Sequence, residues 1–210
     1  MVQKQAKSSL SSDFARLLTQ LSSPHKIQDY LDTLSINFEL RGDTHYSPLT
    51  VFKRKETHCI EAALFAAAAL WYHGHAPLLL DLRAEKNDYD HVVALYKTNG
   101  YWGALSKSNH ATIRYRDPVY KTVRELAVSY FHEWFPEKTG VRTLRSYSEP
   151  LNMERFGYDW IVTDDDLFWV DDSLNKQRHY PIAPLKNLKS ARRADPMEIK
   201  AGSLLEYKPK

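Results

Sequence analysis

The chain has 210 residues, a length that fits a single domain over 1–210. Hydrophobic residues make up 43% of it and aromatic residues 12%, which excludes general disorder. The 29 basic and 26 acidic side chains give a net charge of +3, so we expect no nucleic-acid partner.

The single cysteine cannot form an internal disulfide, so nothing points to an oxidising compartment. The N-terminal stretch has no apolar run of the kind found in a secretory signal. No segment approaches the roughly 20 apolar residues that span a bilayer. We therefore expect a cytoplasmic protein without membrane contact, and we expect residues 1–12 to be mobile.

The first part of the chain predicts two helices. Apolar residues recur at helical spacing over 10–21, which indicates an amphipathic helix. Ser23 followed by Pro24 is a typical helix start, because serine caps the helix and proline suits its first position. Residues 41–56 are interpreted as a polar connection.

The most helix-prone segment begins at Cys59. It has the sequence CIEAALFAAAALWY, in which alanine and leucine favour helix, and Gly74 supplies a stop. The six alanines imply close packing against neighbouring backbone. We expect a buried central helix.

Strands follow this helix. Residues 77–82 form a short apolar run, and the segments 90–96 and 101–106 flank Asn99-Gly100, the strongest short signal for a hairpin. A central helix followed by antiparallel strands predicts an α+β fold.

The remaining chain is less strongly patterned. Helical spacing returns over 119–134, and residues 159–163 suggest a strand. The segment 164–172 is ambiguous. The tail from Lys186 onward is basic and has no clear periodicity.

Cys59 is a candidate nucleophile. It lies where a polar connection meets a long helix, and the unpaired amides and dipole of a helix N-terminus lower the pKa of a thiol. The alternative is that Cys59 is a small core residue, the usual fate of a lone cysteine.

His91 is the candidate base. It opens the first hairpin strand, 32 residues after Cys59, and a strand-start histidine beside a helix-start cysteine is the pairing that thiol catalysis requires. The alternative is an ordinary surface histidine, as we expect for most of the nine histidines.

The hairpin register suggests what orients the imidazole. If Asn99-Gly100 is a two-residue loop, period-2 alternation places His91, Ser106 and Ser108 on one face, with Asn109 just beyond. Each of the three polar residues is a possible acceptor for the ring N–H, and a one-residue shift in register would change the choice.

Three segments together resemble a known superfamily. HCIEAALFAAAALWYHG, DHVVALY and GYWGALS, within about residues 50–110, resemble the transglutaminase-like superfamily of papain-like thiol enzymes. The resemblance implies a cysteine-bearing helix packed on an antiparallel sheet that carries the histidine. It also implies Cys59 as nucleophile, His91 as general base, no cofactor, and a peptide, protein or small acyl substrate.

The sequence departs from this pattern at the third catalytic position. The family expects aspartate at the end of the second hairpin strand, where this chain has Ser106. Asn109 follows three residues later, and papain-like enzymes use asparagine as the orienter, which favours Asn109. Arylamine N-acetyltransferases share the Cys–His–Asp plan and a Cys-x-Glu that Cys59-Ile-Glu61 resembles, and they too expect the aspartate.

Two functions follow. The first is a cysteine hydrolase or acyltransferase that acts on an amide or ester through a Cys59 thioester. The second is a non-catalytic protein of the same fold that acts as a binding or scaffold protein, which the neutral Ser106 favours.

Other polar clusters are weaker candidates. Zinc needs three or four converging ligands, which His58, His73 and His75 do not provide on their own. Asp164–Asp166 lacks the spacing of a calcium loop. We therefore expect no metal, and we interpret the arginines at 114 and 116 as part of an ion-paired turn.

Overall fold

The computed structural model describes residues 10–208, which form an α+β fold. A sheet of seven strands has the order β6-β5-β4-β3-β7-β9, with β8 also pairing with β3, and all its pairings are antiparallel. Its strands are β3 (Leu78–Arg83), β4 (His91–Thr98), β5 (Tyr101–Leu105), β6 (Arg116–Tyr120), β7 (Ser146–Ser148), β8 (Leu151–Asn152) and β9 (His179–Pro181). Two further strands, β1 (Ser35–Ile36) and β2 (Glu56–Thr57), pair in parallel away from this sheet.

Helices surround the sheet. They are α2 (Ser12–Gln20), α3 (Pro24–Asp32), α4 (Pro48–Arg54), α5 (Cys59–Tyr72), α6 (Val123–Ser129), α7 (Asp159–Val162), α8 (Phe168–Asn175), α9 (Leu185–Lys189) and α10 (Pro196–Gly202), with short 3-10 turns η1 (Phe131–Glu133) and η2 (Met153–Phe156). No helix among residues 10–208 has the length and apolar character needed to cross a bilayer.

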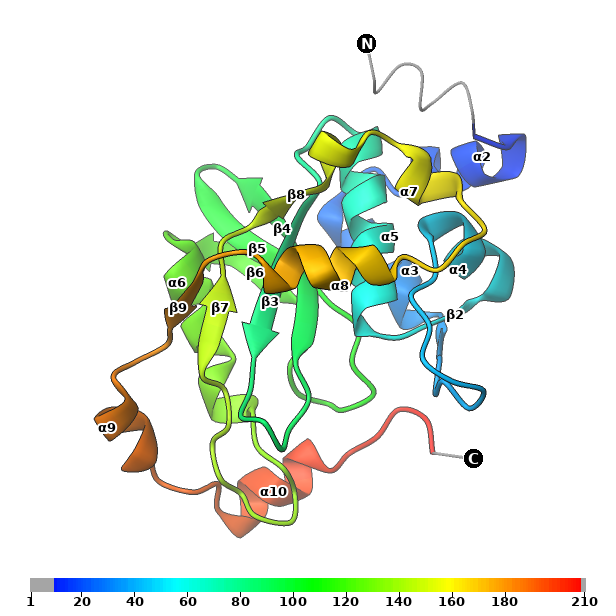
Figure 1. Ribbon diagram of the computed structural model, residues 1–210. Helices are drawn as coiled ribbons and strands as arrows, with labels where there is room; N and C mark the ends of the chain where they lie inside the picture. The colour runs from blue at the N-terminus through cyan, green and yellow to red at the C-terminus, as the bar shows by residue number, and fades with distance from the viewer. Residues whose placement is uncertain (1–9, 209–210) are drawn as a thin grey trace.

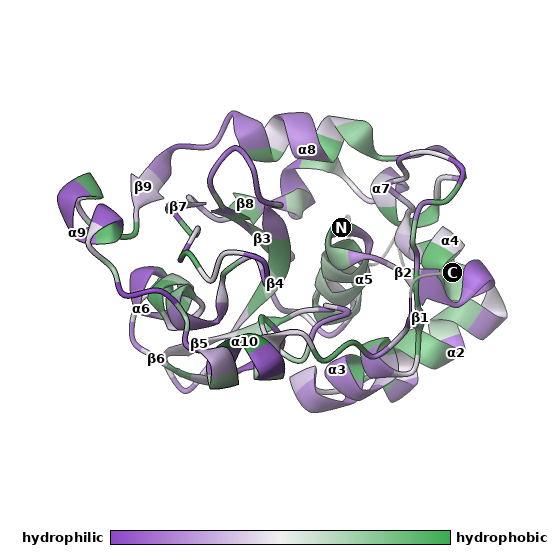
Figure 2. Ribbon diagram, turned by 90° about the horizontal axis from the view of Figure 1, so that it is seen from below, coloured by the Kyte–Doolittle hydropathy of each residue, from purple (hydrophilic) through white to green (hydrophobic). Residues whose placement is uncertain are grey.

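Helix α5 is the buried centre that the alanine-rich sequence predicts. Every residue from 60 to 71 is buried. Figure 2 shows α5 as a green helix in the middle of the molecule, between the sheet and the helices α2, α3, α4 and α7. Because alanine side chains are small, α5 can lie close to the strands and helices on all sides.

The hairpin of β4 and β5 confirms the predicted register. Thr98 pairs with Tyr101 across Asn99 and Gly100, which both have the positive φ values that a two-residue hairpin turn requires. Consecutive residues of β4 then face opposite sides. Val92 belongs to the core cluster that contains α5, and Val93 belongs to the cluster on the other face, which contains α6.

The two N-terminal helices are confirmed. The Ser23 hydroxyl accepts a hydrogen bond from the Lys26 amide at the start of α3, as the Ser-Pro signal predicts. Of the segment 1–12, residues 1–9 lie outside the described part of the chain, and Ser12 is the first residue of α2.

Two of the weaker predictions are wrong. The connection 41–56 contains α4, whose start repeats the Ser-Pro signal: Ser47 caps the helix and Pro48 is its first residue. Residues 159–163 form the short helix α7 rather than a strand, because a run as brief as Trp-Ile-Val carries no periodicity that distinguishes the two. The basic tail contains α9 and α10.

The chain order brings three distant segments to one end of the sheet. The N-terminus of α5, the start of β4 and the segment that follows α10 all lie toward the bottom of Figure 1.

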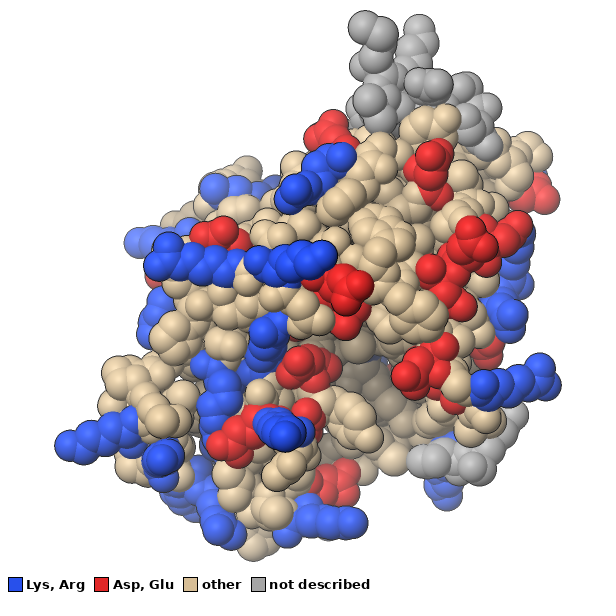
Figure 3. Space-filling view, viewed as in Figure 1, with Lys and Arg blue, Asp and Glu red and all other residues tan. Residues whose placement is uncertain are grey.

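Charge is distributed unevenly over the face in Figure 3. Lys and Arg lie over the lower left near α9 and α10, and Asp and Glu lie over the right near the α7–α8 loop.

Candidate functional site

Cys59 is the first residue of α5 and lines a cavity of about 280 Å³. Cys59 as a whole residue is partly exposed. The amide of a first helical residue has no partner within its own helix, so the Cys59 N–H is free of intrahelical bonding. The position therefore combines a cavity-lining cysteine with an amide free of intrahelical bonding and with the helix dipole.

The pKa of the Cys59 thiol lies well below its ordinary value. Burial alone would raise the pKa, but hydrogen bonds from His58 and His91, together with their positive charges, outweigh it. Two histidines thus favour the thiolate. His58 precedes Cys59 in the chain and His91 follows it.

His91 lies at the start of β4, as predicted, and its outer nitrogen is held in place. Nε2 lies 2.6 Å from the Ser106 hydroxyl, and the Ser106 hydroxyl lies 3.0 Å from the Ile113 carbonyl. A serine has one proton to donate, and the carbonyl can only accept. Ser106 therefore donates to Ile113 and accepts from His91 Nε2–H, which leaves Nδ1 of the neutral ring as the basic nitrogen.

The surroundings of His91 also fix the plane of the ring. Trp134 packs against it at a centroid distance of 6.0 Å and an interplanar angle of 76°. His91, Ser106 and Trp134 are all buried, and His91 and Trp134 also line the cavity. The imidazole is therefore preorganised.

Asn109 does not contact His91. Its side-chain amide bonds the backbone of Tyr207 in both directions, with distances of 2.9 Å from Nδ2 to the Tyr207 oxygen and 2.9 Å from the Tyr207 amide to Oδ1. The preference for Asn109 as the partner of the imidazole is wrong. The hairpin register indicates the right residue, because Ser106 alternates onto the same face as His91.

Ser108, the third candidate, bonds neighbouring residues of its own loop. Its hydroxyl accepts from the His110 amide at 3.1 Å and its carbonyl accepts from Arg114. Ser108 and Asn109 both line the cavity. Of the three sequence candidates, only Ser106 bonds the ring.

The second histidine at the sulfur, His58, has no place in the predicted triad. It precedes Cys59 in the chain, and its Nδ1 lies 4.0 Å from Sγ. Its Nε2 lies 2.8 Å from the Thr44 carbonyl, which can only accept, so Nε2 carries a proton. His58 therefore turns Nδ1 toward the sulfur.

Glu61 places a carboxylate beside His58. Its side chain is fully buried and lies 3.4 Å from His58 Nε2. Burial alone would lower the pKa of His58, but contacts with Cys59 and Glu61 raise it to about 11. At neutral pH His58 is then an imidazolium ion beside the sulfur, and its charge stabilises a thiolate.

The Glu61 carboxylate accepts several hydrogen bonds from protein groups. Its oxygens accept from the amides of Tyr46 and His58 at 3.0 and 2.9 Å, from the Thr44 hydroxyl at 2.8 Å and from the Asn37 amide. Burial would raise the pKa of Glu61, yet His58 and the backbone donors hold it below its usual value. From the sequence, His58 is considered only as a metal ligand. The sequence signal for the His58–Glu61 pair is a histidine three residues before a glutamate at a helix start.

Within residues 10–208, no three His, Cys, Asp or Glu side chains come together to hold a metal ion. No protein-family model matches the chain, and no curated protein matches its sequence significantly. The residues at the α5 N-terminus and the β4 start are therefore the basis for any statement about function.

Proposed function

We propose that this protein is a cysteine hydrolase or acyltransferase of the transglutaminase-like type, in which Cys59 attacks an amide or ester carbonyl. The observation that carries the proposal is that His58 and His91, each held at Nε2 by a fixed acceptor, both interact with the Cys59 thiol. A core cysteine would need neither histidine nor a lowered pKa.

The reaction divides into two halves. The Cys59 thiolate attacks the carbonyl carbon to form a C–S bond, and the oxygen takes the negative charge. The Cys59 amide at the helix N-terminus is one donor for that oxyanion. When the tetrahedral intermediate collapses, the C–N or C–O bond breaks, and the leaving group takes the proton from His91.

In the second half, water or an amine attacks the thioester. His91 takes a proton from this acceptor as general base, the C–S bond breaks, and the thiolate returns with a protonated His91. His58 does not need to exchange protons. Its high pKa makes it a poor acid but a steady positive charge beside the sulfur.

The test is covalent capture of the acyl group. The protein is incubated with glutamine-containing peptides plus a labelled amine, and with simple acyl esters, and Cys59 is analysed by mass spectrometry. We expect an acyl adduct at Cys59 that is absent in Cys59→Ser. The absence of an adduct across the whole panel would contradict the proposal.

One observation favours the second function, a non-catalytic binding protein. The partner of His91 is the neutral Ser106 hydroxyl, which stabilises an imidazolium ion less than a carboxylate does. The same panel distinguishes the two functions, because a binding protein would retain peptide affinity without forming an adduct.

A further inference from the structure

A short segment of the chain lies against the rim of the Cys59 cavity. Residues 204–207 run antiparallel beside residues 109–111, with a bridge between Leu205 and His110. The Ala111 amide donates to the Leu204 carbonyl at 3.0 Å, and the Glu206 amide donates to the Asn109 carbonyl at 2.8 Å. The segment is thus held as an added strand.

The side chains of this segment contribute little apolar burial. Leu204 and Leu205 are 62% and 39% exposed. The backbone bonds do not depend on sequence, and neither does the Asn109 amide that pairs with both backbone groups of Tyr207. An extended peptide of another sequence would find the same partners.

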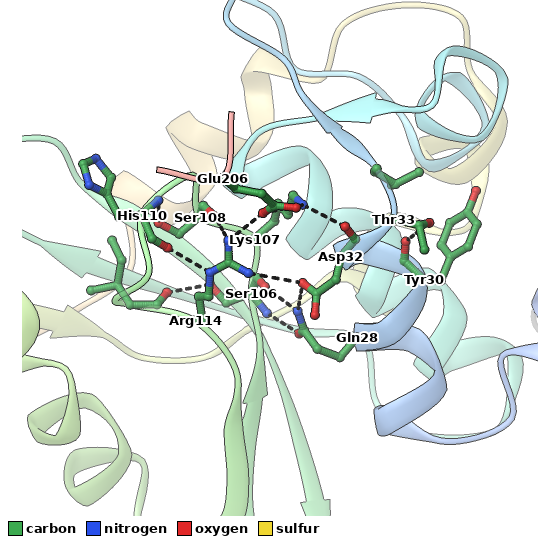
Figure 4. Close-up of polar contacts among 12 residues, drawn as sticks. Gln28, Tyr30, Asp32, Thr33, Ser106, Lys107, Ser108, His110, Arg114 and Glu206 are labelled. Atoms are coloured by element: carbon green, nitrogen blue, oxygen red, sulfur yellow. Dashed lines mark hydrogen bonds and ion pairs between the residues drawn. The ribbon is translucent and has the colours of Figure 1, made fainter. Parts of the chain in front are cut away.

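Two side chains are exceptions. The Tyr207 hydroxyl donates to the Leu34 carbonyl at 3.4 Å, and the Glu206 carboxylate enters a cationic site (Figure 4). Lys107 Nζ lies 3.2 Å from one Glu206 oxygen and Arg114 lies 2.6 Å from the same oxygen. The Lys107 side chain is fully buried and that of Glu206 is 26% exposed.

The cationic site needs a second anion besides Asp32. Apart from Glu206, Lys107 Nζ has the Asp32 carbonyl at 3.4 Å and the centroid of the Tyr207 ring at 5.6 Å, and a buried ammonium ion with these contacts alone is costly. The Asp32 carboxylate lies 3.8 Å from Arg114 and offsets one of the two positive charges. Glu206 balances the other.

Arg114 stays in place without Glu206. Its guanidinium also donates to the carbonyls of His110 and Ser108 at 2.8 and 2.9 Å. Lys107, Ser108, Asn109 and His110 line the same cavity as Cys59 and His91. The cationic site is therefore built into the rim of the candidate active site.

We propose that residues 107–111 and Arg114 form a binding subsite for an extended peptide that carries an acidic side chain, and that residues 203–208 occupy this subsite in cis. A peptide from another molecule would add as a strand beside 109–111 and place its carboxylate between Lys107 and Arg114. This inference concerns binding and holds whether or not Cys59 forms a thioester.

The experiment uses two fluorescein-labelled synthetic peptides, one with the sequence of residues 203–208 and one in which glutamine replaces its glutamate. Fluorescence anisotropy measures their affinity for the full chain and for Glu206→Lys, in which the cis segment is repelled from Lys107 and Arg114. We expect Glu206→Lys to bind the acidic peptide about tenfold more tightly than the unaltered chain does, and to bind the glutamine peptide about tenfold more weakly than the acidic one.

Glu154→Lys is the matched control, because Glu154 is exposed on η2 and the charge change is the same. It should bind like the unaltered chain. Glu206→Gln releases the segment without reversing charge and decides the matter if Glu206→Lys does not fold. Equal affinity of the released variant for the two peptides, or equal affinity of the released and control variants for the acidic peptide, would overturn the proposal. Because no acyl transfer is measured, these outcomes are independent of the test on Cys59.

Discussion

Ser106 Oγ lies 2.6 Å from His91 Nε2, at the position where the resemblance predicts an aspartate. The serine can accept from the ring only because its own proton goes to the Ile113 carbonyl at 3.0 Å. A neutral hydroxyl thus fixes the tautomer of the imidazole, although it adds no negative charge.

Ser106→Ala should therefore remove the partner of two polar groups, the buried His91 Nε2–H and the carbonyl of the half-buried Ile113. We expect the free energy of unfolding to fall by about 1–3 kcal/mol in urea titrations. We also expect acyl turnover to fall while alkylation of Cys59 persists, because His58 still stabilises the thiolate.

The control for this change is Ser148→Ala. Ser148 on β7 is equally buried, its hydroxyl accepts from the Asp81 amide at 3.0 Å, and β3 separates it from the β4 strand that carries His91. The two variants should lose comparable stability, but only Ser106→Ala should change turnover. Equal turnover in both would remove Ser106 from the mechanism.

A second prediction concerns Gly103 in β5. A Cβ at this position would lie 2.4 Å from the Tyr96 ring, which belongs to the core against α5. Gly103→Ala should lower the free energy of unfolding by about 1–3 kcal/mol, because the ring has to shift within a packed sheet. In a double-mutant cycle, Tyr96→Ala should relieve most of the added cost. A cycle without coupling would mean that the strand itself moves.

A third prediction concerns Glu61 and pH. The folded-state pKa of Glu61 lies below its ordinary value of 4.5, so its contribution to stability is complete above that value and disappears as pH falls through the folded-state pKa. Glu61→Gln should be less stable than the unaltered chain by about 3 kcal/mol at neutral pH. Urea titrations from pH 7 to pH 3 should show this difference shrinking below about pH 4.5. A difference that stays constant over this range would mean that the charge of Glu61 is not what stabilises the fold.

The elements predicted correctly are those with local signals. Asn99-Gly100 sets the hairpin, the hairpin sets the register, and the register places Ser106 on the same face as His91. The alanine run predicts α5 in the same local way. These inferences need only neighbours in the chain and the periodicity of strands and helices.

The features that were missed depend on contacts between distant segments. Glu61 is bonded by residues 37–46, and Asn109 is bonded by Tyr207, 98 residues away. No periodicity in the sequence indicates such pairings. The prediction of Asn109 rather than Ser106 is wrong for this reason. The Asn109 side chain bonds Tyr207, in a segment whose location the sequence does not reveal.

The last prediction separates the two histidines at Cys59. His58 and His91 both lower the pKa of the thiol, and they come from different elements, the cap of α5 and the start of β4. The rate of reaction with iodoacetamide follows the thiolate, so its dependence on pH reports the pKa of Cys59. We expect His58→Asn and His91→Asn each to raise the midpoint of this profile. The double variant should reach or exceed about 8.5, the value of a free cysteine, because both histidines that oppose the effect of burial are gone.

The two single variants should differ in turnover. His91→Asn removes the group that we propose to exchange protons with the substrate, so acyl transfer should be lost even at a pH where the thiolate is present. His58→Asn should retain acyl transfer once pH is raised to restore the thiolate. His73→Asn is the control, because His73 caps the opposite end of α5 and bonds the Leu18 carbonyl at 2.7 Å. His73→Asn should change neither the pH profile of alkylation nor the rate of acyl transfer. If His58→Asn leaves the alkylation profile unchanged, His58 serves only the start of the helix, and His91 alone activates Cys59.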